Sequence, residues 1–157
     1  MHGLVVPLLS SILESNEYQI RKVINILLAY KGRSLGFLGL SFKEGTDDLR
    51  ESPIVEVIET MIGKGFKVRI HDGNVSMARL IGANREYIEK EIPHISNLLC
   101  SSADELIAQS EVIVIANKDK EYSDRLNGVA EDQTILDLVR LFGPEDHPKA
   151  QYYGVCW

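Results

Sequence analysis

The stretch GRSLGFLGLSFKEGTDDLRESP, from Gly32 to Pro53, decides the fold of this chain. It begins with a run of apolar and small residues at 35–42. Such a run between chain breakers is typical of a strand that is buried on both faces of a parallel sheet. A polar loop follows at 43–51, and Ser52-Pro53 then indicates a helix start, with serine as the N-cap and proline in the first helical position.

The polar loop holds two cations, Lys43 and Arg50, at the predicted carboxyl edge of the sheet. Open α/β sheets bind ligands at that edge, and a helix N-terminus there offers N–H groups and a positive dipole to an anion. The pair could therefore hold a diphosphate. Alternatively, both cations only neutralise the four carboxylates of the same loop, and residue types alone leave the two interpretations open. These carboxylates are Glu44, Asp47, Asp48 and Glu51.

Composition limits the class of protein. The chain has 157 residues, a hydrophobic fraction of 45% and a net charge of −6, which suits one soluble domain but not a nucleic-acid binder with a basic face. No apolar run approaches the roughly 20 residues of a membrane helix, and the apolar stretch at 4–13 lacks the basic leading region of a signal peptide. Two cysteines form no metal or disulfide pattern, so we expect a reduced, cytoplasmic protein without membrane contact.

Hydrophobic periodicity predicts alternating helices and strands. An amphipathic helix at 8–30 either lies on the domain's own core or connects it to something outside this sequence. Further helices are predicted at 53–64, 76–82, 85–91, 102–109 and 118–126, and strands at 35–42, 66–71, 98–100, 111–116, 134–139 and 152–155. This order predicts a doubly wound α/β domain with a mostly parallel, Rossmann-like sheet, preceded by a long N-terminal helix.

The sequence alone offers no complete catalytic set. Gly36, Gly39 and Gly45 do not form the G-x-G-x-x-G fingerprint of a dinucleotide site. Asp72 lies 33 residues after Gly39, where a ribose-binding acid is expected after about 20, and is interpreted as a turn residue with Gly73. The cysteines, at positions 100 and 156, are interpreted as small buried hydrophobes.

Three segments carry a resemblance to a known family. The run GFLGLSFKEGTDDLRESPIVEVIE at 36–59 closely resembles the start of the C-terminal domain in the UDP-glucose/GDP-mannose dehydrogenase family. GANREYIEKEIPHIS at 82–96 and GVCW at 154–157 are most similar to the members of that family that oxidise GDP-mannose. The approach PLLSSILESN at 7–16 also resembles the end of the family's long middle helix.

The resemblance implies roles for individual residues. Members of the family oxidise a nucleotide sugar twice, from alcohol to acid, with two NAD molecules consumed, and serve polysaccharide biosynthesis. By resemblance, Lys43 would contact the pyrophosphate and hexose of the substrate, with Phe42 beside it. Arg140, after the strand ILDLV, would face the same ligand, and Arg50 would reach towards NAD bound by another domain.

The resemblance also implies a division into domains. Residues 1–31 would be a connecting helix from a middle domain, and residues 32–157 a nucleotide-sugar-binding α/β domain. The family's NAD-binding domain and its catalytic cysteine, in a G-x-x-C-x-K-D setting, have no counterpart in this sequence. We therefore expect a binding domain that is inactive alone and belongs to a homodimer in the intact enzyme. A UDP-glucose-type domain and a non-catalytic protein-interaction module are the alternatives.

Overall fold

The computed structural model describes residues 7–41, 49, 52–75, 93, 97–143 and 146–155. In this part of the chain the centre is a five-stranded sheet in the order β2-β1-β3-β4-β5, and every neighbouring pair is parallel. The strands are β1 (Leu35–Leu38), β2 (Val68–His71), β3 (Val112–Ile115), β4 (Thr134–Asp137) and β5 (Gln151–Gly154). The Rossmann-like α/β prediction is confirmed.

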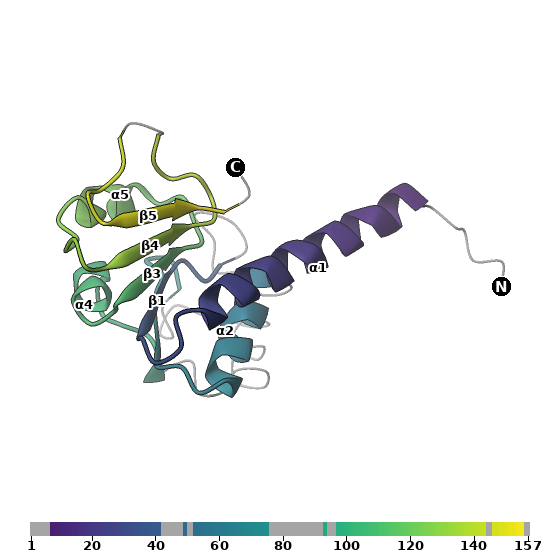
Figure 1. Cartoon of the computed structure of the whole chain (residues 1–157), viewed down its shortest axis with the longest axis horizontal. Coiled ribbons are helices and arrows are strands. Elements are labelled where there is room, and N and C mark those ends of the chain that lie inside the picture. The colour runs from purple at the N-terminus through teal and green to yellow at the C-terminus, as the bar shows by residue number, and fades with distance from the viewer. Residues whose placement is uncertain are drawn as a thin grey trace.

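Helices cover both faces of this sheet (Figure 1). One face packs against α1 (Pro7–Leu28) and α2 (Pro53–Gly63), and the other against α4 (Ala103–Ala108) and α5 (Lys120–Leu126). Residues 76–92, where two short helices are predicted, lie outside the described residues.

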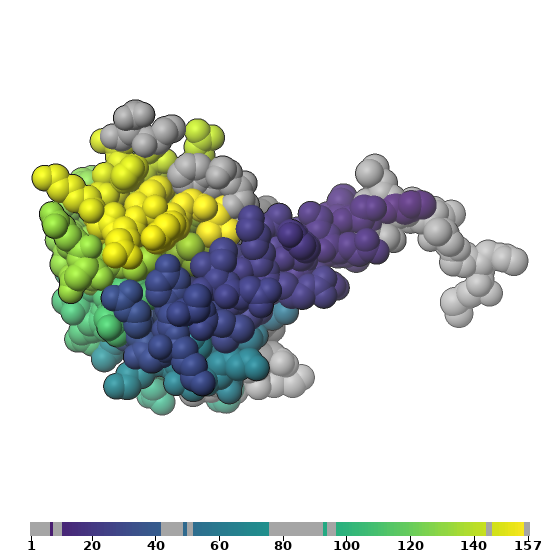
Figure 2. Space-filling model, in the orientation of Figure 1, coloured from purple at the N-terminus to yellow at the C-terminus, as the bar shows by residue number. Residues whose placement is uncertain are grey.

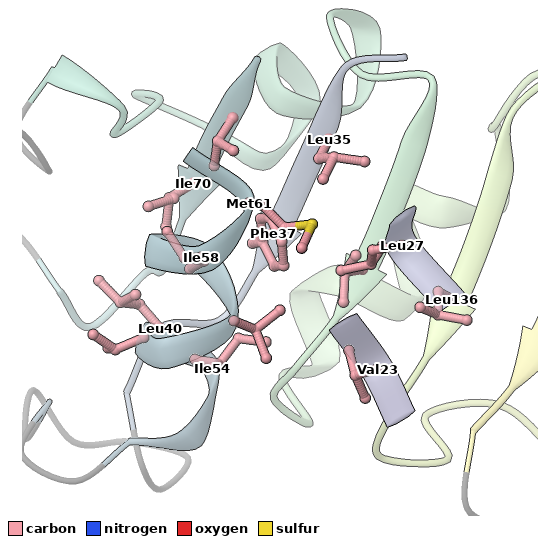
Figure 3. Packing of buried hydrophobic residues seen from close by; sticks show 14 of the residues in the cluster. Val23, Leu27, Leu35, Phe37, Leu40, Ile54, Ile58, Met61, Ile70 and Leu136 are labelled. Atoms are coloured by element: carbon pink, nitrogen blue, oxygen red, sulfur yellow. The ribbon is translucent and has the colours of Figure 1, made fainter. Parts of the chain in front are cut away.

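The strands are apolar throughout because side chains alternate between two separate cores. Phe37 of β1 and Val114 of β3 join the core under α1 and α2, whereas Leu38 and Ile115 join the core under α4 and α5. Figure 3 shows the first core, which also receives Ile58 from α2, as the sequence predicts. The described part of the apolar run, residues 35–41, is therefore a strand followed by a turn.

The predicted strand at 35–42 is shorter than expected, because the chain turns away from the sheet at Gly39. This glycine has a φ of 97°, which few residues with a side chain adopt, and its backbone lies against Asn117. Most other differences are of one to three residues at element ends. The predicted strand at 98–100 is a single bridge between Leu99 and Ile70.

Helix α1 has two dissimilar halves. Its C-terminal half lies on the first core, where Val23 and Leu27 are buried. Its N-terminal half projects from the body of the molecule (Figures 1 and 2) and exposes 51% of Ile12 and 66% of Leu13. None of the described helices is long and apolar enough to cross a membrane.

Substituting three glycines distinguishes the cost of an unfavourable φ from the cost of a steric clash. We expect Gly63→Ala, in open space inside α2, to be neutral or slightly stabilising, because alanine favours a helix by up to about 1 kcal/mol. Gly65→Ala, also in open space but at a φ of 83°, should cost about 1–2 kcal/mol. Gly39→Ala should cost about 3 kcal/mol or more, because its new Cβ would also lie 2.9 Å from the Asn117 backbone nitrogen.

Urea unfolding of the three variants measures these costs. Gly39→Ala should be the least stable of the three, because only its new Cβ would clash with Asn117. Equal unfolding midpoints for the variants at positions 39 and 65 would contradict it.

Candidate functional site

A cleft of about 510 Å³ lies at the carboxyl edge of the sheet. Its walls come from the segments that follow β1, β3 and β4, from the start of α2, and from α1. The described lining residues are Asn16, Gln19, Ile20, Val23, Ser41, Ser52, Pro53, Ile54, Val57, Ala116, Leu138 and Val139. The volume is within the range of about 300–1,000 Å³ that is usual for small-molecule sites.

The cleft includes the point where the strand order reverses. The chain passes from β1 to β2 on one side and then returns to β3 on the other side of β1. The segments after β1 and β3 therefore leave in different directions, and ligands of open α/β sheets bind in the crevice between them. At this point the Asn117 side-chain amide donates to the Ser41 hydroxyl across 3.0 Å.

The carboxylate of Asp72 fixes the segment after β1. One oxygen accepts from Asn74 N at 2.9 Å and Val75 N at 3.2 Å, which confirms the predicted turn. The other oxygen accepts from Leu40 N at 2.8 Å and Ser41 N at 2.9 Å, which the sequence does not predict. Asp72 is 5% exposed, so it joins the end of β2 to the wall of the cleft from the inside.

Helix α2 presents its N-terminus to the cleft. Ser52 is the N-cap, with proline directly after it, as predicted. Its hydroxyl does not cap the helix, however, but donates to Leu40 O at 3.0 Å. The hydroxyl thus ties the helix start to the segment after β1, and the positive end of the helix dipole faces the cleft.

The segment after β4 is held by a second buried carboxylate. Asp137 is fully buried and accepts from Val139 N at 2.9 Å, Leu141 N at 2.7 Å and the Tyr152 hydroxyl. Burial, and then this hydrogen bond to Asp137, raise the pKa of Tyr152 above its ordinary value, so the hydroxyl stays protonated and donates. The clamp places Leu138 and Val139 on the cleft.

Arg140 is the predicted site residue that the structure describes. It follows Val139, is exposed, and has a φ of 56°, an uncommon value for a residue with a side chain. It therefore lies beside the cleft and does not belong to its described lining. Phe42, Lys43 and Arg50 lie outside the described residues, although Ser41 and Ser52, close to them in sequence, both line the cleft.

Sequence reasoning missed the contribution of α1 to the cleft. Asn16, Gln19, Ile20 and Val23 follow one another at helical spacing, so they share a face, and all four line the cleft. The three- and four-residue spacing of these positions is the signal in the sequence that they share one helix face. The apolar positions of the helix predict a stripe, whereas the positions of Asn16 and Gln19 do not by themselves indicate a cleft.

The described residues offer no activated nucleophile and no cluster of metal ligands. Cys100 is half-buried, and burial raises the pKa of its thiol, so the reactive thiolate is disfavoured. No group of three or more potential metal ligands occurs in the part of the chain that the structure covers. Cys156 lies outside that part.

The glycines near β1 serve packing and turning. A side chain at Gly36 would meet Leu106 Cδ2 at 2.6 Å, so this position lets α4 approach the sheet. Gly39 provides the turn into the cleft. Packing at Gly36 and the turn at Gly39 therefore explain both glycines, and neither requires a dinucleotide site.

Comparison with known proteins agrees with this geometry. Residues 36–144 match the sequence model of the UDP-glucose/GDP-mannose dehydrogenase family, UDP binding domain. The GDP-mannose 6-dehydrogenase of Pseudomonas aeruginosa is 48% identical over 151 residues, which cover 96% of this chain and 34% of that protein.

Solved structures give the same result. A ternary complex of GDP-mannose dehydrogenase from Pseudomonas aeruginosa matches with a TM-score of 0.84 and 46% identity, over 96% of this chain and 34% of that one. A UDP-glucose dehydrogenase from the archaeon Pyrobaculum islandicum matches with a TM-score of 0.68 and 26% identity, over 94% and 32%.

The chain spans about a third of the length of the relatives that it matches. The matched region contains β2 to β4, all of β1 except its first residue, and the segments after β1, β3 and β4 that line the cleft. This chain belongs to the UDP-glucose/GDP-mannose dehydrogenase family and carries its UDP-binding domain.

Proposed function

We propose that this chain supplies the nucleotide-sugar site of an NAD-dependent GDP-mannose 6-dehydrogenase. The observation that carries the proposal is the cleft at the strand-order reversal, with the N-terminus of α2 on its wall. The 48% identity to a GDP-mannose 6-dehydrogenase favours GDP-mannose over UDP-glucose as the ligand. In the intact enzyme, GDP-mannose is oxidised to GDP-mannuronate.

Four residues carry the proposed contacts. Lys43 binds the pyrophosphate and hexose region, Phe42 lies beside it, Arg140 approaches the same ligand, and Arg50 reaches towards NAD. Lys43 follows Ser41 by two positions and Arg50 precedes Ser52 by two, so each is tethered to the cleft wall by about 7 Å of chain. A local cation offsets the net charge of −6, because two charges about 4 Å apart interact by about 4 kcal/mol at an effective dielectric constant near 20.

The remaining parts of the enzyme are proposed to lie outside this chain. Residues 1–31 connect to a middle domain with the catalytic cysteine, and residues 32–157 form the binding domain. NAD is held mainly by an N-terminal domain, and the intact enzyme is a cytoplasmic homodimer.

Lys43→Ala should weaken GDP-mannose binding by about tenfold or more, because a charge-assisted hydrogen bond contributes about 1.5–3 kcal/mol. Calorimetric titration of the chain with GDP-mannose, GDP and UDP-glucose measures this loss, and GDP-mannose should bind more tightly than UDP-glucose. Raising the salt concentration should weaken binding to the unsubstituted chain, since ions screen the contact.

Two variants serve as controls for this titration. Lys64→Ala removes an exposed lysine at the other end of α2 and should leave the affinity unchanged. Arg50→Ala should also leave GDP-mannose affinity nearly unchanged, because its proposed partner is NAD. Equal affinity of the unsubstituted chain and Lys43→Ala would contradict the proposed role of Lys43.

The chain alone should form no NADH from GDP-mannose and NAD. Its sequence lacks the dinucleotide fingerprint and the family's cysteine motif, and burial raises the pKa of Cys100. NADH absorbance checks this with purified protein that binds GDP-mannose in the titration. A sustained rise in absorbance would show that the chain carries a complete catalytic set.

The exposed apolar residues of α1 favour a second candidate, a protein-interaction module. On this alternative, the projecting half of α1 binds a second copy of the chain, and light scattering detects a dimer. The double variant Ile12→Glu/Leu13→Glu would then give a monomer, while Asn25→Glu, in the packed half of α1, would not. A monomer for the unsubstituted chain at all concentrations would contradict self-association.

A further inference from the structure

The sequence places a glycine after one asparagine, at Asn127-Gly128, and after one aspartate, at Asp72-Gly73. Asparagine side chains are chemically labile, and the backbone nitrogen of the next residue can attack them. A glycine nitrogen is the most accessible, because glycine has no side chain and its flexible backbone can bring the nitrogen to the preceding side-chain carbon. The structure separates the two positions.

The pair Asn127-Gly128 lies at the end of α5, and both residues are exposed. Among the described residues, no hydrogen-bond partner holds the Asn127 carboxamide or the Gly128 N–H. A Cβ built at Gly128 would meet no atom within 4 Å, so the approach to its nitrogen is open. The attacking nitrogen and the carboxamide are therefore both available.

The backbone of this turn is helical but weakly held. Asn127 has a φ of −61° and a ψ of −22°, so Gly128 N has to rotate away from this conformation before it reaches Cγ of Asn127. The Gly128 N–H breaks no hydrogen bond to a described residue in this rotation, and the ends of helices open at low cost. The bond from Val129 N to Leu126 O, at 3.2 Å, spans the pair and resists the rotation.

The pair Asp72-Gly73 is protected by the same criteria. The two oxygens of Asp72 accept four backbone N–H groups, and the residue is 5% exposed. Attack by Gly73 N would require these bonds to break. The other described asparagines precede residues that carry side chains, and they are at positions 16, 25, 74, 97 and 117.

We propose that Asn127 is a site of spontaneous covalent modification, at which the folded chain deamidates through a succinimide. Gly128 N loses its proton and bonds to Cγ of Asn127, while the bond from Cγ to the amide nitrogen breaks and that nitrogen leaves as ammonia. Water, the co-reactant, then opens the ring. Cleavage between Cγ and the Gly128 nitrogen gives aspartate, and cleavage between the main-chain carbonyl carbon of Asn127 and that nitrogen gives isoaspartate.

The products alter the packing beneath α5. Both add a negative charge at the C-terminus of the helix, where the dipole is also negative. Isoaspartate also lengthens the main chain by one methylene between Leu126 and Val129, which are 0% and 9% exposed and belong to the core under α4 and α5. Neither residue of the pair lines the described cleft, so the inference does not depend on the proposed function.

The test incubates the folded chain at neutral pH and follows each asparagine by mass spectrometry of tryptic peptides. Asn127 lies in the peptide at 126–140, which contains no other asparagine. This peptide should deamidate before those of the other described asparagines and should give both aspartate and isoaspartate. In urea, Asn127 should react faster, and Asp72 should form isoaspartate as well, because its protecting bonds are lost. The folded chain that carries isoaspartate should unfold at a lower urea concentration than fresh protein.

Gly128→Val is the matched variant. The position has open space and no positive φ, so valine fits without strain, and circular dichroism verifies the fold. A side chain branched at Cβ shields the nitrogen and should slow deamidation about tenfold or more, which corresponds to about 1.4 kcal/mol in the barrier. Gly63→Ala, also in open space but in α2, should leave the rate at Asn127 unchanged.

Three outcomes would overturn the proposal. If the peptide at 126–140 stays unmodified in the folded chain but deamidates in urea, the turn protects the site. If Asn127 reacts no faster than the other described asparagines, the selection by exposure and by Gly128 is wrong. Equal rates for Gly128→Val and the unsubstituted chain would exclude attack by the Gly128 nitrogen. An unchanged urea midpoint for the isoaspartyl chain would overturn the predicted effect on the core.

Discussion

The buried carboxylate of Asp72 is the interaction on which the cleft depends. Burying a carboxylate without partners costs several kcal/mol, and four backbone N–H groups offset this cost here. In return, the segment after β1 is bound to the end of β2, which is its only fixed neighbour on that side of the described sheet. The same bonds explain why Asp72 is no ribose ligand, because both of its oxygens face the backbone and are buried.

Asp137 plays the corresponding role at the other side of the cleft. It accepts from the segment after β4 as Asp72 accepts from the segment after β1. Between them, Gly39 and Asn117 bring the ends of β1 and β3 close together. Buried hydrogen bonds from Asp72 and Asp137 therefore position the segments after β1 and β4, which line the cleft. The apolar cores position the strands themselves.

The elements were predictable from the sequence, whereas the bonds between loops were not. Periodicity located the helix at Pro53 and the strand at Val112–Ile115 within one or two residues, because each depends on local apolar spacing. Strand β1 was overestimated because Gly39 and Leu40 are as apolar as a strand but serve a turn. The contact of Asp72 with Leu40 spans 32 residues, and no local pattern signals such a bond.

The role of α1 was hidden for a similar reason. Its apolar stripe left open a core helix and a connecting helix. In the structure Val23 and Leu27 lie in the core, each contributing about 1.5–3 kcal/mol through burial, whereas Ile12 and Leu13 are exposed. Asn16 and Gln19 of the same helix line the cleft together with residues that follow β3 and β4, and no pattern within α1 signals those distant segments.

The net negative charge of the chain bears on how the cleft and the N-terminus of α2 could attract an anionic ligand. A chain with a net charge of −6 repels anionic ligands at a distance, so attraction to a diphosphate has to come from short range. The dipole of α2 and, in the proposed function, the charge of Lys43 act over such distances. The described wall of the cleft beside α2 is uncharged and largely apolar, so burial of a ligand surface there would not depend on charge. Because α1 forms one wall of that cleft and part of the core, any movement of this helix changes both the packing of the domain and the shape of the cleft.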